Sequence, residues 1–105
     1  MIKATIIPCS IQIKPMIETV VCTLDISNSF AEFADKFDND EAPGRAAKGI
    51  RVLYRGFSRE NPSKVVIVVQ AEEGVITSHM QDNAARFVKN GALMDTAVVS
   101  SYGES

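Results

Sequence analysis

Alternating apolar and polar positions predict four β-strands along the chain. They cover residues 18–26, 50–58, 64–71 and 94–101. In the first strand, one face carries four apolar side chains, which are Val20, Cys22, Leu24 and Ile26. The second and third strands are separated by polar residues that include Asn61 and Pro62, which is typical of a hairpin turn.

Two other segments have apolar residues at helical spacing. The first begins at Ser29, where Glu32 three residues later completes the pattern of a capping box. Its apolar stripe consists of Phe30, Phe33, Ala34 and Phe37. The second helix is predicted over residues 74–89 and ends at Asn90-Gly91. Its stripe consists of Ile76, Met80, Ala84, Phe87 and Val88. Between the first helix and the second strand, residues 38–49 predict a loop with a short helical turn before Gly49.

The resulting order, β-α-β-β-α-β, is the ferredoxin-like α+β pattern, an antiparallel sheet with two helices on one face. The third strand is apolar on both faces, because it reads Val65, Val66, Ile67, Val68 and Val69. Val98 and Val99 give the fourth strand the same character. A sheet face that met water would alternate with polar residues. We therefore expect a homodimer packed sheet against sheet, which would form a dimeric α+β barrel.

The length of 105 residues suits one domain. We expect it to span residues 16–105, preceded by an extension over residues 1–15 that forms an extra strand or an arm. No apolar run approaches the ~20 residues of a membrane span, and no export signal is visible, so a cytoplasmic location is expected. Cys9 and Cys22 are too few for a disulfide framework and are interpreted as thiols without chemistry.

Charge and composition exclude several functions. Eleven basic residues against thirteen acidic ones give a net charge of -2, which argues against nucleic acid and anionic membranes as partners. The first and third strands carry no aromatic residue on which bases could stack. One histidine and two cysteines leave little for a metal site or a catalytic triad, and we expect no metal. The acidic cluster at residues 38–41 lacks the pattern of a calcium loop and is interpreted as solvated.

The remaining candidate is an aromatic-lined space between helices and sheet. Its predicted apolar lining consists of Phe30, Phe33, Phe37, Tyr54 and Met80. His79 or Arg55 would meet the polar head group of a fatty-acid-like or quinone-like ligand. This assignment places Tyr54 on the same strand face as Ile50 and Val52, with Gly56 leaving room beside it.

Two alternatives remain open at this stage. In the first, the protein is a cofactor-independent enzyme of the monooxygenase or isomerase type, with His79 or Tyr54 as acid or base. In the second, it is a stress-associated or interaction protein without a pocket, in which the phenylalanines pack as an ordinary core. The sequence does not decide whether the protein is an enzyme.

A family resemblance is carried by Arg55-Gly56, Asn61-Pro62, Lys64-Val65-Val66 and the segment 70–74. These residues resemble a family of small uncharacterised proteins of aquatic and cyanobacterial type, classed as a domain of unknown function. The resemblance covers residues 17–101 and implies no established activity. Some members have Gly-His where this chain has Gly91-Ala92, so no site is carried over there.

More broadly, the chain is similar to the dimeric α+β barrel superfamily, which includes cofactor-independent monooxygenases, lactone isomerases and haem-degrading proteins. The resemblance implies a site between sheet and helices in each protomer. In haem-degrading members the axial histidine comes from the second helix, the element that carries His79. Their usual tryptophan has no counterpart in this chain. No cofactor is expected, with haem as a minor alternative.

Overall fold

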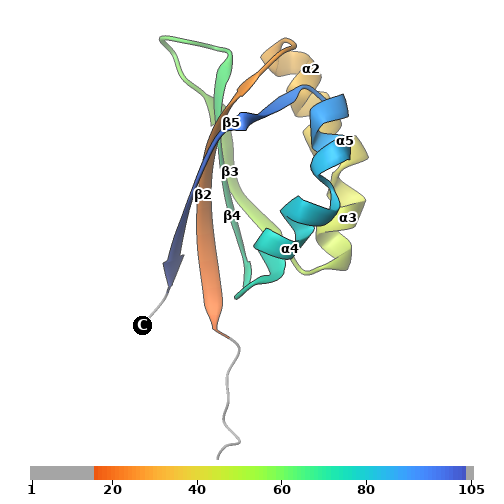
Figure 1. The fold of residues 1–105 in the computed structure, drawn as a ribbon, viewed down its shortest axis with the longest axis vertical. Coiled ribbons are helices and arrows are strands. Elements are labelled where there is room, and N and C mark those ends of the chain that lie inside the picture. The colour runs from red at the N-terminus through yellow and green to blue at the C-terminus, as the bar shows by residue number, and fades with distance from the viewer. Residues whose placement is uncertain (1–15, 104–105) are drawn as a thin grey trace, which may run out of the picture.

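The computed structural model describes residues 16–103, and its main feature is one antiparallel sheet with helices on a single face (Figure 1). The strands follow the order β3-β4-β2-β5 across the sheet. They are β2 (Ile17–Ile26), β3 (Arg51–Phe57), β4 (Lys64–Glu72) and β5 (Ala92–Gly103). The predicted extension over residues 1–15, with Cys9, lies outside the described residues.

Two groups of helices connect the strands. The first group, between β2 and β3, consists of α2 (Phe30–Asp35), the π-helical segment η1 (Lys36–Asp40) and α3 (Ala42–Ala47). The second group, between β4 and β5, consists of α4 (Val75–Asp82) and α5 (Ala84–Lys89). Each predicted helix is thus a divided helical segment, and the ferredoxin-like α+β fold is confirmed.

The local signals at the helix ends explain this division. The predicted capping box starts α2, since the Glu32 backbone N–H donates to Ser29 Oγ at 3.1 Å. The short helical turn predicted before Gly49 is present as α3, with Pro43 in its first turn, where proline is tolerated, but residues 38–40 of the predicted loop belong to the π-helical segment η1. The predicted continuous second helix breaks at Asn83, whose backbone leaves the helical region at φ -114° and ψ 12°.

The face of the sheet toward the helices carries the core. The predicted inward set of β2 is confirmed, since Val20, Cys22, Leu24 and Ile26 are all buried. β4 pairs with β2 so that Val20 lies opposite Val69 and Leu24 lies opposite Val65. Cross-strand partners point to the same face, which makes the two central strands the floor of the core.

A β-bulge in β3 changes the face of the sheet on which the later side chains of this strand lie. Val52 pairs with Val69, but the next paired residue is Tyr54, opposite Val68. Leu53 is the extra residue, so Tyr54 lies on the face away from the helices and Arg55, opposite Ile67, lies on the helix side. The predicted strand faces of Tyr54 and Arg55 are therefore wrong, because a single inserted residue exchanges the two faces beyond it.

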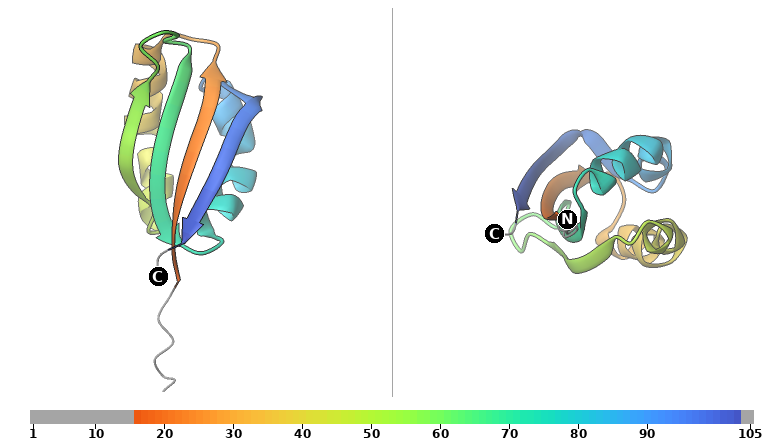
Figure 2. Two further views of the ribbon diagram at one scale, coloured as in Figure 1. Left: turned by 90° about the vertical axis from the view of Figure 1, so that its left-hand side faces the viewer. Right: turned by 90° about the horizontal axis from the view of Figure 1, so that it is seen from below.

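The opposite face of the sheet has no helices over it (Figure 2, left). It carries apolar side chains from all four strands, since the registers place these residues on the same side: Val21, Tyr54, Val66, Val68, Val98 and Tyr102. Tyr54, Val98 and Tyr102 are each more than half exposed. No helix in residues 16–103 is long and apolar enough to cross a membrane.

Candidate functional site

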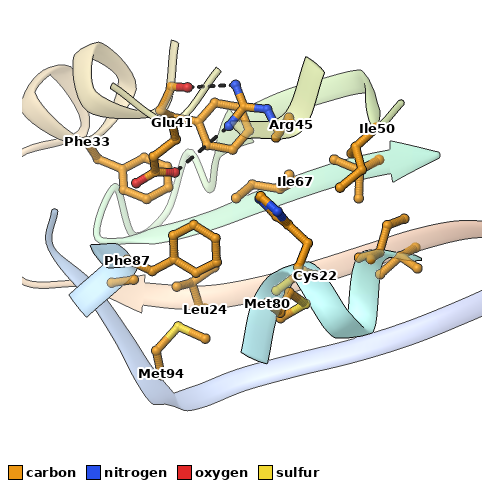
Figure 3. A pocket seen from close by; sticks show the side chains of 16 residues that line it. Cys22, Leu24, Phe33, Glu41, Arg45, Ile50, Ile67, Met80, Phe87 and Met94 are labelled. Carbon is orange, nitrogen blue, oxygen red and sulfur yellow. Dashed lines mark hydrogen bonds and ion pairs between the residues drawn. The ribbon is translucent and has the colours of Figure 1, made fainter. Parts of the chain in front are cut away.

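A cavity of about 90 Å³ lies between the sheet and the two groups of helices. Side chains from β2, β4, β5 and the helices surround it (Figure 3). Most of this wall is apolar and includes Leu24, Phe33, Phe37, Ile67, Met80, Phe87 and Met94. The cavity exists because the strands bring small or branched side chains to the floor, while the large aromatic side chains come from the helices.

Three polar side chains interrupt this apolar wall, and all come from the helical layer. They are Glu41 at the start of α3, Arg45 on α3 and His79 on α4. Their exposed fractions are 7%, 8% and 6%, so each is almost fully removed from water. Buried charges and imidazoles are costly unless their surroundings satisfy them. Their contacts therefore indicate what the site can do.

The Arg45 guanidinium lies flat against Phe37. Its central carbon is 3.9 Å from the ring centroid, and its NH2 group donates to the Phe37 backbone oxygen at 2.6 Å. NH1 lies 3.9 Å from Glu41 Oε1, which is within ion-pair range but too long for a hydrogen bond. Burial lowers the pKa of Arg45, and the charge of Glu41 partly opposes this effect. The guanidinium stays charged, because its pKa starts far above neutrality.

Glu41 is held mainly by an amide. Asn90 Nδ2 donates to Glu41 Oε2 at 2.7 Å and also lies 3.0 Å from Asp40 Oδ2. Burial raises the pKa of Glu41, while the hydrogen bond from Asn90 and the charge of Arg45 lower it. The ion pair with Arg45 is therefore not strong enough to offset the loss of hydration of the carboxylate.

His79 is buried beside Asn83, one helical turn later. Asn83 Nδ2 is 2.9 Å from the His79 backbone oxygen and 3.2 Å from His79 Nδ1. Burial lowers the pKa of His79, and the positive charges of Lys48 and Arg45 lower it further. The imidazole is consequently neutral at physiological pH.

The structure brings together four of the seven predicted site residues. Phe33, Phe37, His79 and Met80 line the cavity. Three others lie elsewhere. Phe30 packs against Phe57 with a centroid distance of 4.7 Å, and Arg55 forms two hydrogen bonds to the Asp38 carboxylate at 3.0 and 2.6 Å. Tyr54 lies on the open face, where its ring covers Gly56; the expected room beside that glycine is filled by Tyr54 itself.

Sequence reasoning missed Glu41, Arg45 and Phe87 as cavity residues. The interpretation of residues 38–41 as a solvated acidic cluster is wrong for Glu41, because α3 turns this side chain inward. The available signal was the spacing of Glu41 and Arg45, four residues apart, which is typical of a helical ion pair. This spacing indicates an ion pair between Glu41 and Arg45 only once the segment is known to be helical.

The cavity does not fit haem. A porphyrin carries four fused pyrrole rings around its iron, which is far more than about 90 Å³ can hold. Axial histidines usually donate their second ring N–H to an acceptor, whereas His79 Nδ1 faces an amide donor. Within residues 16–103, no three His, Cys, Asp or Glu side chains gather closely enough to hold a metal ion.

Comparison with solved structures supports the same architecture. A protein from Caulobacter crescentus, named as a candidate antibiotic biosynthesis monooxygenase, is 18% identical, with a TM-score of 0.62 over 87% of this chain and 92% of that one. Protein PA3566 from Pseudomonas aeruginosa is 11% identical, with a TM-score of 0.55 over 88% and 96% of the two chains. Protein SO0527 from Shewanella oneidensis is 17% identical, with a TM-score of 0.52 over 86% and 91%.

These likenesses concern the fold, since all three identities are low. No curated protein is similar enough to the chain to count as a relative. One family model does match, and it covers residues 17–104, which include every cavity residue described above. The chain therefore belongs to the family described as Domain of unknown function (DUF3764).

Proposed function

We propose that the protein binds a compact, mostly apolar molecule that presents an acceptor oxygen, as a quinone-like compound does. The observation that carries this proposal is the cavity, whose apolar wall, as formed by residues 16–103, is interrupted only by Glu41, Arg45 and His79. Ligand sites typically combine such a wall with a few convergent polar groups that orient the ligand.

Arg45 and His79 supply the donors for that oxygen. Among the described residues, the Arg45 guanidinium makes one hydrogen bond, through NH2, and its other N–H groups keep donor capacity. Because Asn83 Nδ2 is a donor and lies 3.2 Å from His79 Nδ1, we assign Nδ1 as the acceptor and place the proton of the neutral ring on Nε2, a second donor. The oxygen of a carbonyl, phenolate or carboxylate group can accept hydrogen bonds from these donors. An ammonium group, or a hydroxyl that must donate, fits these donors less well.

The size of the cavity narrows the ligand further. An engineered cavity of about 150 Å³ binds benzene, and drug-sized ligands occupy about 300 Å³ or more. At about 90 Å³, the cavity is smaller than the one that binds benzene, so a single ring enters only if side chains of the wall shift. This favours the quinone-like over the fatty-acid-like ligand, because an extended acyl chain requires the helices to move apart.

Fluorine NMR with para-fluoroacetophenone tests the proposal, since this probe has one ring and one carbonyl oxygen. Fluorobenzene is the matched probe without the oxygen. The wild-type protein is expected to bind the ketone about tenfold more tightly, the worth of one hydrogen bond to a charged donor. The preference should shrink in Glu41→Gln/Arg45→Met, which leaves no unpaired buried charge and only the His79 donor, and should persist unchanged in the exposed control Arg59→Met. Equal binding of both probes to the wild type contradicts the proposal.

A second candidate function is acid–base catalysis on a carbonyl compound in the same cavity. The observation that favours it is Glu41, a buried carboxyl whose pKa is raised and which faces the cavity. Its carboxylate would take a proton from the carbon beside the carbonyl, and the electron pair would move onto the oxygen held by Arg45 and His79. Return of the proton to another carbon completes an isomerisation.

This second function would show as solvent deuterium entering the methyl group of para-fluoroacetophenone. The wild-type protein should accelerate the exchange, and Glu41→Gln should abolish the acceleration without abolishing binding. Tyr54→Phe is the control, because Tyr54 lies on the opposite sheet face. Exchange at the uncatalysed rate in the wild type removes the candidate.

We also propose that two copies pair through the open face of the sheet. Val98 is 62% exposed and Tyr102 58% exposed, and the registers place both on the open face with Val66 and Val68, beside Thr19 and Thr23 of β2. Monomeric proteins rarely expose such a surface, and a two-fold pair covers it with the same residues from each copy. Sedimentation should give a dimer for the wild type and a monomer for Val98→Lys. Val88→Lys, on the helical side, is the control, and a monomeric wild type contradicts the proposal.

A further inference from the structure

The two groups of helices meet along a seam that polar side chains bridge at both ends. At one end, Lys48, the residue after α3, pairs with Asp82 of α4 at 3.6 Å. At the other, Arg86 of α5 pairs with Asp40 of η1 at 3.5 Å. These four side chains are largely exposed, and exposed ion pairs contribute little to stability. The Asn90 amide also crosses the seam and donates to Glu41 Oε2 at 2.7 Å and to Asp40 Oδ2 at 3.0 Å, so the exposed ion pairs are only part of what holds the two groups together.

An outer hollow of about 220 Å³ lies in the middle of this seam. Its walls come from both groups of helices, with Pro43 and Gly44 on one side and Asn83 and Arg86 on the other. Figure 2, right, shows the two groups of helices as separate columns beside the sheet.

The outer hollow and the inner cavity share three wall residues, which are Glu41, His79 and Phe87. These side chains form the partition between the solvent-facing hollow and the cavity. Side chains change rotamer far more easily than strands separate. A molecule passing from solvent to cavity therefore meets the least resistance here.

Gly44 is the residue that leaves the hollow open. A Cβ built on it would lie 3.5 Å from His79 Cε1, which is ordinary contact, so a longer side chain would extend over the hollow. The positive-φ glycines of the described chain are Gly49, Gly74 and Gly91, so the backbone at Gly44 does not require glycine. A glycine inside a helix lowers helix stability, and what it provides here is space.

We propose that ligands enter the cavity through this seam and that Gly44 keeps the entrance open. The inference rests on the proposed binding function and adds a route and a residue that sets the rate of exchange. Gly44 lines the outer hollow but not the cavity. Filling this position should therefore slow entry and exit equally and leave the affinity unchanged.

The exchange rate of para-fluoroacetophenone, measured by fluorine NMR, tests this inference. Gly44→Leu should slow both association and dissociation by at least about tenfold, a barrier increase near 1.4 kcal/mol. Ala46→Leu is the matched control, because it adds the same side chain to an exposed position of α3 on another side of the helix. Unchanged rates in Gly44→Leu overturn the entrance but leave the binding function standing. A weaker affinity in that variant also overturns it, because the leucine then occupies the cavity.

A second variant tests the entrance from the opposite direction. Lys48→Ala/Arg86→Ala removes both ion pairs of the seam and should speed up the exchange of the probe at unchanged affinity. Exchange no faster than in the wild type overturns the inference, even if Gly44→Leu fails to fold. If the wild-type protein binds no probe at all, the proposed function itself fails, and this result is distinct from a change in rate.

Discussion

The side-chain amide of Asn83 faces Nδ1 of His79 and assigns the tautomer of its ring. Its nitrogen lies 2.9 Å from the His79 backbone oxygen and 3.2 Å from Nδ1 of the same residue. The backbone oxygen can only accept, so it fixes the amide with its NH₂ group toward the imidazole. Nδ1 must then accept, and the proton of the neutral ring stays on Nε2. His79 is thereby a hydrogen-bond donor at the cavity rather than a base.

The titration of His79 follows from this arrangement. Burial and the nearby positive charges lower its pKa, and the Asn83 donor opposes a proton on Nδ1. Asn83→Asp replaces the donor with a carboxylate and should raise the pKa of His79 above the wild-type value. NMR titration gives this directly, because the sequence contains one histidine. A value that stays the same or falls would contradict the assigned tautomer.

The same shift predicts a pH dependence of stability. His79 has a lower pKa in the folded state than in the unfolded state, so the unfolded chain binds more protons below the usual histidine pKa near 6.5. The contribution of His79 to the free energy of unfolding should therefore fall as the pH drops below about 6.5 and level off below the folded pKa. Urea unfolding across this range measures it, and His79→Gln should remove this part of the dependence.

Glu41 should show the opposite sign. Its pKa is raised in the folded state, so its contribution to stability is present below the usual glutamate pKa and is lost as the pH rises through the folded value. Glu41→Leu leaves the Arg45 charge buried without a partner and should cost about 3–5 kcal/mol. Glu41→Gln keeps an acceptor for Asn90 and should cost less. Equal losses in both variants would show that the Asn90 hydrogen bond contributes nothing.

Phe33 tests the packing of the cavity wall. It is 4% exposed and belongs to the core together with Phe37 and Leu24. Phe33→Ala should lower the free energy of unfolding by about 3–5 kcal/mol. Val88→Ala, at a position 55% exposed, should stay within about 0.5 kcal/mol. A loss below about 1 kcal/mol at Phe33 would mean that the cavity wall collapses to fill the space.

Gly91 and Gly56 make a contrasting pair. Gly91 has a φ of 107°, and a Cβ there would collide with the side-chain amide of Asn28. Gly91→Ala should therefore destabilise the protein by more than 1 kcal/mol, since it adds backbone strain and a collision. At Gly56 the added Cβ meets only the exposed ring of Tyr54, which can swing away. Thermal unfolding should show a clearly smaller loss for Gly56→Ala.

The element order and the inward face of β2 follow from the sequence alone. The strict alternation of apolar residues at Val20, Cys22, Leu24 and Ile26 allows only one face of β2 to be buried. The start of α2 is equally local, because Ser29 and Glu32 satisfy each other's free backbone N–H groups within a single turn. These signals are local, so no distant contact is needed to interpret them. The same holds for Phe33, Phe37 and Met80, whose helical spacing predicts the buried stripe that lines the cavity.

Tertiary structure decided the rest of the site. The bulge at Leu53 adds one residue to β3 relative to β4, and only the pairing of the two strands determines it. Because of this bulge, Tyr54 lies on the open face. The buried Glu41 and Arg45 depend on partners from outside α3, since Asn90 donates to Glu41 and Arg45 lies over the ring of Phe37 and donates to its backbone oxygen. Sequence periodicity shows which face of its own helix or strand a residue occupies. Whether a charged side chain is buried depends on the residues that a second element packs against it. The sequence by itself determined the fold, its apolar core and His79 as a site residue, and only long-range packing placed Glu41 and Arg45 in the cavity.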